Sequence, residues 1–329
     1  MKIKSIICVV IIIICSVFTL GFYSKLIDSD SHFNSPEYKG IITLWQIDSF
    51  EGGTGSRRQF LLKVAREYER RNQGVLIMVI DHTFESVKEA VKKGECPDLI
   101  SYGNGVDILE MQPLLTDKFF KGGALNKTQY LIPWCRGGYC IITKGENQYI
   151  KGKIIDKILL SKTEYNQPAL ALSLEGVRAN EYVVKSPLDA YVDFVGGKAK
   201  YLLGTQRDVI RLQNRGVDFS IFPLTEYNDL YQYMGITTSE QTKVYYARDF
   251  INYLLSSAVQ RKLDEIGMLS CFDRVEYQSE KMSTLQDAKQ NYTLSAFTDK
   301  DSLGRIHDLA INFLKGDKEC EIKIKNMLI

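Results

Sequence analysis

The sequence predicts an α/β fold arranged as two lobes, and three observations support this. The chain has 329 residues, enough for two domains of ordinary size. It is 45% hydrophobic and 25% charged, with only 7 prolines, which is the composition of ordered globular domains. Short apolar runs alternate along it with amphipathic stretches, and this alternation is typical of a parallel sheet covered by helices on both faces.

The first series of elements begins with a β-type run over residues 40–45. Apolar residues at helical spacing then predict a helix over residues 60–68. Residues 75–80 are continuously apolar, as expected of a strand that is covered on both faces. A second helix is expected over residues 84–93 and a third strand over residues 99–102.

A second series follows residue 130. Strands are expected at residues 139–143, 169–173, 218–222 and 231–237, and helices at residues 187–196, 205–214, 245–256, 258–266 and 303–314. The strand at 231–237 is expected to return to the first series. Two α/β lobes joined by more than one crossing segment are therefore the simplest interpretation.

Residues 1–25 differ from the rest of the chain. Lys2 and Lys4 precede an uncharged, mostly apolar stretch that ends at Lys25. This pattern predicts an export signal or a single membrane anchor, with everything after Lys25 outside the cytoplasm. The residues before Cys15 are not the small ones of a lipoprotein signal, and whether the segment is cleaved stays open. Residues 26–39 are polar and aperiodic, and we expect them to be a tether.

The charges argue against nucleic acid as a partner, because the formal net charge is +2 and no block of like charges forms a basic face. The chain has three histidines and, after residue 25, five cysteines at irregular spacing. We therefore expect no metal site, no catalytic residue and no cofactor. Cys135 and Cys140 flank two glycines; a disulfide between them and two buried free thiols both remain open.

Four segments of the chain resemble the extracellular solute-binding proteins of ABC importers. They are residues 94–101 (Gly-Glu-Cys-Pro-Asp-Leu-Ile-Ser), 194–199 (Phe-Val-Gly-Gly-Lys-Ala), 216–224 (Gly-Val-Asp-Phe-Ser-Ile-Phe-Pro-Leu) and 247–269, which begins Ala-Arg-Asp-Phe-Ile. They occur in the family's order, and the resemblance covers roughly residues 40–270. The chain departs from the family in lacking the lipoprotein cysteine and in having Lys200 and Tyr201 after Ala199.

This resemblance implies a two-lobed periplasmic-binding-protein-like fold with a hinge and a ligand cleft between the lobes. One lobe would hold residues 40–132 and 236–280, and the other residues 133–235 and 281–329. The protein would bind a small solute outside the cytoplasm, a sugar first and an anionic molecule second. It would deliver this solute to the permease of an ABC importer, with no chemistry of its own.

Ligands of open parallel sheets bind beyond the carboxyl ends of the strands, so the strand-end loops hold the candidate residues. The glycine-rich run at residues 52–57 opens a helix, whose N-terminus favours oxygen-rich groups; a tight turn with an ordinary cap is the alternative. Aromatic rings can pack on the C–H faces of sugars, and charged side chains can bind hydroxyls or a carboxylate. The candidates are Trp45, Asp48, Glu51, Gly53, Thr54, Ser56, Arg57, Tyr102, Asn104, Trp134, Arg136, Tyr139, Glu175 and Arg178.

Two alternative functions remain at this stage. A membrane-anchored sensor would use the same fold and cleft but pass its signal to a membrane kinase. Residues 52–57 also resemble the phosphate loop of sugar nucleotidyltransferases, in which glycines cradle a triphosphate and an arginine neutralises it. The export segment argues against this second alternative, because nucleotide is scarce outside the cytoplasm.

Overall fold

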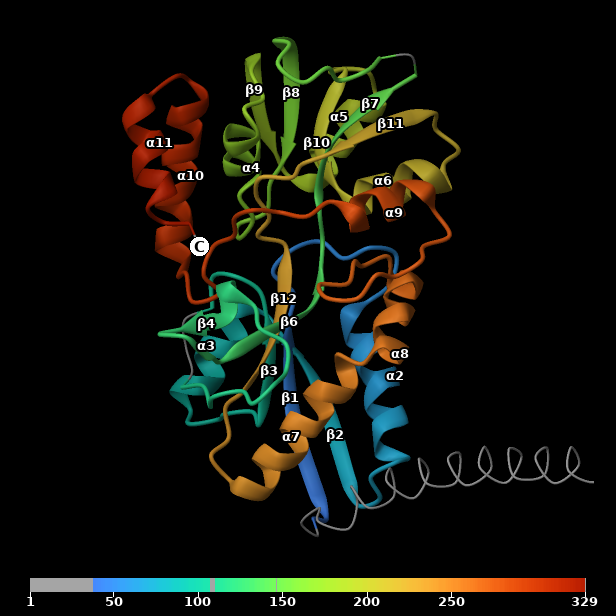
Figure 1. The fold of residues 1–329 in the computed structure, drawn as a ribbon, viewed down its shortest axis with the longest axis vertical. Coiled ribbons are helices and arrows are strands. Elements are labelled where there is room, and N and C mark those ends of the chain that lie inside the picture. Colours follow the sequence, from blue (N-terminus) through green and yellow to red (C-terminus); the bar gives the residue numbers. More distant parts are fainter. Residues whose placement is uncertain (1–37, 107–109, 146, 329) are drawn as a thin grey trace, which may run out of the picture. The chain divides into compact units, whose positions relative to one another are not determined.

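The computed structural model describes residues 38–106, 110–145 and 147–328. Residues 40–329 form one compact unit, and the chain before Gly40 is a unit of its own. The predicted export segment, residues 1–25, and all but the last two residues of the predicted tether lie outside the described residues. The unit that begins at Gly40 has two lobes, each built on a five-stranded sheet (Figure 1).

The sheet of the first lobe has the strand order β2-β1-β3-β12-β6. β1 is parallel to β2 and β3, whereas β12 is antiparallel to both β3 and β6. Side chains alternate along β1, so that Trp45 and Ile47 pack with Phe84 and Val87 of α3 on one face. α2 and α7 contact each other and cover β2 and β12. The strands are β1 Gly40–Ile47, β2 Val75–His82, β3 Leu99–Tyr102, β6 Leu131–Arg136 and β12 Tyr231–Ile236, with a small hairpin of β4 Ala124–Leu125 and β5 Thr128–Gln129. The helices are α2 Arg57–Glu69, α3 Phe84–Lys92, η1 Lys121–Gly123, α7 Gln241–Leu254, α8 Ser257–Gln260 and η2 Arg261–Ile266.

The sheet of the second lobe has the strand order β11-β7-β10-β8-β9. Its core includes apolar residues of β7, β8 and β10 and of helices α5 and α6, together with Leu269, Val275 and Tyr277. α10 packs against α4 and α11. The strands are β7 Tyr139–Lys144, β8 Ile155–Ser161, β9 Ala179–Lys185, β10 Tyr201–Thr205 and β11 Phe219–Pro223. The helices are α4 Pro168–Glu175, α5 Pro187–Val195, α6 Gln206–Asn214, α9 Glu280–Asp287, α10 Lys300–Leu314 and α11 Lys318–Lys325.

Three hinge segments cross between the lobes: β6 to β7, β11 to β12, and the chain after η2 (Figure 1). The chain between α9 and α10 also passes back, because Ala296, expected in the second lobe, packs in the core of the first, whereas α10 packs on α4 of the second. The first and third hinge segments are joined, because the backbone N–H of Arg136 donates to the carbonyl of Leu269 and the reverse bond also forms, at 2.8 and 2.9 Å. Pairing of β6 with β12 places residues 133–135 and 231–235 in the first lobe. The crossings therefore fall a few residues away from the boundaries expected at 132/133 and 235/236. Leu269 and Tyr277, expected in the first lobe, pack in the core of the second.

Most of the expected elements are confirmed, but residues 169–173 are not a strand. They lie in α4, which begins with Pro168 at its first turn and ends at Gly176 in the left-handed conformation, φ 73°. All but one of the residues of this helix from Pro168 to Glu175 are buried, so the segment carries no polar face from which a helical period could be recognised. The strands β4, β5, β6, β8, β9 and β10 and the helices η1, α9 and α11 were not anticipated, and residues 258–266 divide into α8 and η2.

The described cysteines are all free thiols, so Cys135 and Cys140, both buried, do not form the disulfide that the sequence left open. Within the described part of the chain, no cluster of three or more His, Cys, Asp or Glu side chains is placed to hold a metal ion. No helix among those residues is long and apolar enough to cross a membrane.

Candidate functional site between the lobes

The lobes meet where the loop after β3 faces the loop between β8 and α4. Tyr165 of the second lobe stacks on Phe84, the first residue of α3, with ring centroids 3.8 Å apart and planes 19° apart. Gly105 makes room for this contact, because a Cβ there would lie 2.7 Å from Cδ1 of Tyr165. Gly105 also has a φ of +96°, which favours glycine. We call Phe84, Asn104, Gly105, Tyr165 and Gln167 the interlobe site.

Two amide side chains of this site are buried without hydrogen-bond partners. Asn104 is 2% exposed and Gln167 is fully buried. Neither the oxygen nor the nitrogen of either side-chain amide has a partner among the described residues. A buried polar group without a hydrogen bond is costly, and such groups are uncommon in folded proteins. Asn104 adjoins Gly105, and Gln167 lies two residues beyond Tyr165, so the two lobes each contribute one amide beside the same contact.

Asp229 positions Gln167 by a hydrogen bond to its backbone. Its Oδ2 accepts the backbone N–H of Gln167 at 2.7 Å, and its Oδ1 accepts the hydroxyl of Tyr139 at 2.7 Å. Burial raises the pKa of Asp229 to about 6, against the opposing effect of the hydrogen bonds from Tyr139 and Gln167. This carboxyl belongs to the β11–β12 crossing, so it connects α4 of the second lobe to the hinge.

The rim of the interlobe site carries a charged pair. Lys300 at the start of α10 donates to Glu164 at 2.8 Å, and its ammonium lies 5.6 Å from the centroid of the Tyr165 ring. Both side chains are about half exposed or more, so the pair adds little stability. The floor of the site is thus neutral and amide-bearing, with aromatic rings beside it.

Comparisons with known proteins agree with this architecture. No protein-family model matches the chain, and no curated protein matches it. Solved structures do match. The galacto-N-biose/lacto-N-biose I-binding protein of the ABC transporter from Bifidobacterium longum is 10% identical, with a TM-score of 0.58 over 89% of this chain and 98% of that one. The sugar-binding protein MalE from Xanthomonas citri is 14% identical, with a TM-score of 0.57 over 88% of this chain and 95% of that one. The Atu4243 GABA receptor is 12% identical, with a TM-score of 0.54 over 84% of this chain and 98% of that one.

The chain has the periplasmic-binding-protein-like fold. At these identities the likeness is one of fold.

The glycine-rich run of the first lobe packs against η2. The backbone N–H groups of Thr54 and Gly55 both donate to the carbonyl of Ile266, at 3.1 and 3.4 Å. A Cβ on Gly53 would lie 2.3 Å from that same carbonyl oxygen, so glycine is needed there for close approach. Ser56 caps α2 by accepting the backbone N–H of Gln59 at 3.3 Å. The run is therefore a tight turn with a helix cap, which is the alternative to a ligand-binding loop. The N–H groups of Thr54 and Gly55 are bonded to Ile266 and are not free to cradle a phosphate.

The charged residues around this turn make structural contacts. Arg57 is 1% exposed, and its Nε donates to Asp48 at 2.8 Å while its Nη2 donates to the carbonyl of Phe50. Glu51 lies 3.4 Å from Arg207 and 3.8 Å from Arg211, both on α6 of the second lobe. Glu51 therefore connects the lobes through ion pairs. The arginine that would neutralise a triphosphate in the transferase alternative is buried against Asp48.

The predicted aromatic residues lie inside the lobes. Trp134 is fully buried, donates its indole N–H to Ser101 at 3.0 Å and stacks on Phe60 of α2. Trp45 and Tyr102 are buried in the core around α3. Tyr139 is 2% exposed and contributes to the interlobe site only through Asp229. Their positions follow from strand alternation, which turns each of these side chains to a covered face of its sheet.

The remaining candidates lie away from the interlobe site. Glu175 accepts the backbone N–H groups of Thr225 and Glu226, at 2.8 and 3.1 Å, and pairs with Lys151. Arg178 is exposed and donates to the carbonyl of Gly152 at 3.3 Å. Arg136 forms part of a separate cavity at the hinge, considered below.

Of the predicted residues, the structure brings only Asn104 into the interlobe site directly. Phe84, Tyr165, Gln167 and Asp229 were not anticipated. A strand assigned to residues 155–161 would have pointed to Tyr165 and Gln167 through the same strand-end rule. Asp229 had no such signal, because its role depends on a contact with Tyr139, which is 90 residues away in the chain.

Proposed function

We propose that this protein binds a small, neutral, polyhydroxylated solute, a sugar first of all, between its lobes. The observation that carries the proposal is the pair of buried amides, Asn104 and Gln167, whose side chains have no hydrogen-bond partner among the described residues. An amide offers both a donor and an acceptor, and a sugar hydroxyl can satisfy either. Both amides are uncharged, which favours a neutral ligand over an anionic one.

The aromatic contact supports the same class of ligand. The rings of Phe84 and Tyr165 come from opposite lobes, so a solute entering between them would meet an apolar face on each side. Aromatic faces pack well on the C–H surface of a sugar ring. Two of the proteins with this fold are sugar-binding proteins, which supports the same class of ligand.

A two-lobed fold with a hinge suits a transport role better than a catalytic one. Closure of the lobes around a solute gives the loaded protein a conformation that a permease can distinguish from the empty one. We therefore propose that the loaded protein is presented to the permease of an ABC importer and that the protein has no catalytic activity. Residues 1–25 would serve as export signal or anchor and residues 26–39 as tether, placing the lobes outside the cytoplasm. The support for this location is the Lys2, Lys4 and apolar pattern of the sequence.

Thermal unfolding of residues 40–329 tests the proposal against mono- and oligosaccharides, amino acids, polyamines and oxyanions. A solute at 100 times its Kd stabilises the folded state by about 2.7 kcal/mol, which is a shift of several degrees in Tm. Asn104→Ala and Gln167→Ala are expected to remove the shift caused by the sugar. The matched controls, Asn180→Ala and Gln73→Ala, change exposed amides and should leave it intact.

Two outcomes would contradict the proposal. One is a panel in which no neutral polar molecule shifts Tm while an anion does. The other is a sugar whose affinity is the same in Asn104→Ala and Gln167→Ala as in the wild type. We also expect that a labelled sugar is recovered chemically unchanged after incubation with the protein.

A further inference from the structure

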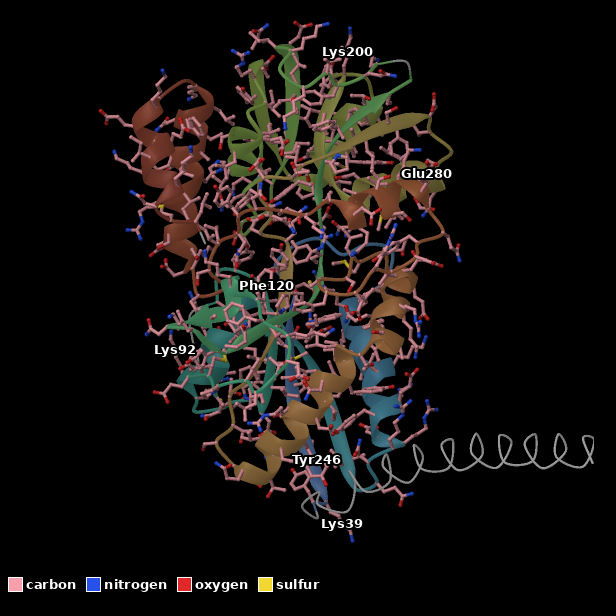
Figure 2. The ribbon with its side chains drawn as sticks, viewed as in Figure 1. Lys39, Lys92, Phe120, Lys200, Tyr246 and Glu280 are labelled. Atoms are coloured by element: carbon pink, nitrogen blue, oxygen red, sulfur yellow. The ribbon has the colours of Figure 1, made fainter. Side chains whose placement is uncertain are left out.

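A cavity of about 700 Å³ lies at the hinge, away from the interlobe site. Arg136 at the end of β6, Tyr231 at the start of β12 and residues 270–274 line it, so each of the three crossing segments contributes. Phe120, labelled in Figure 2, and residues 286–290 after α9 complete the wall. We call this cavity the hinge pocket. None of its residues belongs to the interlobe site, and its volume suits a small molecule.

The buried end of the hinge pocket carries a positive charge. Arg136 is 5% exposed, and its Nη2 donates to the carbonyl of Gln286 at 2.8 Å while its Nε donates to that of Ser270 at 3.1 Å. The carbonyls of the last turn of α9 supply about half an elementary charge at a helix C-terminus, which offsets only part of the cation. No carboxylate of the described chain lies within 4 Å of its guanidinium.

The exposed side of the hinge pocket also has an unpaired cation. Lys289 is exposed, and no described carboxylate lies within 4 Å of its ammonium. Both carboxylates of the wall are already paired: Asp273 lies 3.6 Å from Lys118, and Asp287 lies 3.6 Å from Arg274. Arg136 and Lys289 are therefore the charged groups of the wall that have no described counter-ion, while the Oδ2 atom of Asp273 is buried without a hydrogen-bond partner.

The sides of the hinge pocket are aromatic. The rings of Phe120 and Tyr231 lie 4.8 Å apart, and Phe272 is on the same wall. Burial raises the pKa values of Tyr231 and Cys271 to about 12, so neither carries a negative charge at neutral pH. Cations without counter-ions beside aromatic rings form a surface that fits an anion with an apolar body.

We propose that the hinge pocket is a second ligand site, which takes a small organic carboxylate with an apolar body. The carboxylate would lie between Arg136 and Lys289, and the apolar body would pack among Phe120, Tyr231 and Phe272. Because the walls come from all three crossing segments, a ligand bound here contacts the parts of the chain whose geometry sets the angle between the lobes. Its occupancy is therefore linked to lobe closure.

Matched pairs of acid and amide test this proposal in the full-length protein. The probes are hexanoate, benzoate and 3-phenylpropionate, each beside its neutral amide, with Tm measured at low ionic strength. At least one carboxylate is expected to raise Tm more than its amide does. Lys289→Gln should weaken its apparent affinity at least threefold, and Phe272→Ala should weaken it further.

The control is Lys92→Gln, which removes an exposed lysine of α3 that is labelled in Figure 2 and lies outside the hinge pocket. It is expected to leave the carboxylate response unchanged, as are Asn104→Ala and Gln167→Ala. The proposal is overturned if no carboxylate acts differently from its amide, or if Lys289→Gln and Phe272→Ala both bind the carboxylate as the wild type does. Loss of the sugar response with the carboxylate response intact would contradict only the proposed function.

Discussion

Replacing Asp229 with asparagine is expected to change how stability depends on pH. Asp229 is a carboxyl with 4% exposure, held by the Tyr139 hydroxyl and the backbone of Gln167. No cation of the described chain forms an ion pair with it. An asparagine keeps the shape and can still accept the backbone N–H of Gln167, but its amide group then faces the Tyr139 oxygen, whose hydroxyl hydrogen loses its acceptor. The substitution therefore removes the charge and adds a cost that does not depend on pH.

The size of the effect follows from the pKa. In the folded chain the pKa of Asp229 is about 6, against 3.8 for an unperturbed aspartate. The folded state therefore holds its proton more tightly than the unfolded state. Below pH 3.8 both states are protonated and the carboxyl costs nothing. As pH rises from 3.8 through 6 the wild type loses stability, up to about 3 kcal/mol, and above that window the loss is complete.

Urea unfolding followed by the fluorescence of Trp45 and Trp134 measures this directly between pH 4 and 8. The difference in unfolding free energy between Asp229→Asn and wild type should shift by about 2.5 kcal/mol over that range, in favour of the variant as pH rises. Burial also raises the pKa of Asp208 to about 6, but Asp208 is present in both proteins and cancels. Asp156→Asn, at an exposed position, is the control. A difference that stays flat, or that shifts against the variant as pH rises, would refute the reasoning.

Three further substitutions have defined outcomes. Gly53→Ala should lower the unfolding free energy by about 2 kcal/mol, because its Cβ would lie 2.3 Å from the carbonyl oxygen of Ile266; an unchanged urea midpoint would contradict this. Trp134→Phe removes the hydrogen bond to Ser101 and part of a buried ring, and should cost about 2 kcal/mol in urea unfolding while leaving solute affinity unchanged. Glu51→Gln removes ion pairs with two arginines of α6 and should lower the unfolding free energy by at most about 1 kcal/mol at low salt. This loss should shrink in 1 M salt, because salt screens the ion pairs. A loss that does not depend on salt would show that the ion pairs do not stabilise the fold.

The elements that the sequence predicted well are those with a local signal. The helix at residues 205–214 has Thr205 as its cap, whose hydroxyl accepts a backbone N–H of the first turn. The strand at residues 75–80 is continuously apolar and becomes β2. Residues 169–173 were assigned to the wrong element, since a run of apolar residues that is buried all round fits a strand and a helix equally well by periodicity. The local helix signals of this segment are Pro168 at its first turn and Gly176 at its end. In the structure this segment packs as a helix against α10 and β8.

The site residues divide in the same way. Asn104 was predicted as a candidate because it lies just beyond the end of a strand, which is a local property. Trp134 was a candidate to stack on a sugar because of its aromatic ring. In the structure it is a core residue that stacks on Phe60 of α2. Arg136 was expected in a ligand cleft, but it lies at the hinge because it contacts carbonyls of residues 270 and 286, more than 130 positions further along the chain.

By itself, the sequence determined the α/β class, the two lobes, many of the helices and strands, and the strand-end loops where a ligand would bind. These depend on periodicity, caps and glycines, which act over a few residues. The tertiary structure alone decided that Phe84 and Tyr165 stack between the lobes, that Asn104 and Gln167 are buried without hydrogen-bond partners, and that Asp229 accepts the backbone N–H of Gln167. It also decided that three crossing segments enclose the hinge pocket. Such contacts join residues tens to more than a hundred positions apart, and burial and hydrogen-bond satisfaction are properties of the assembled fold that no short stretch of sequence carries.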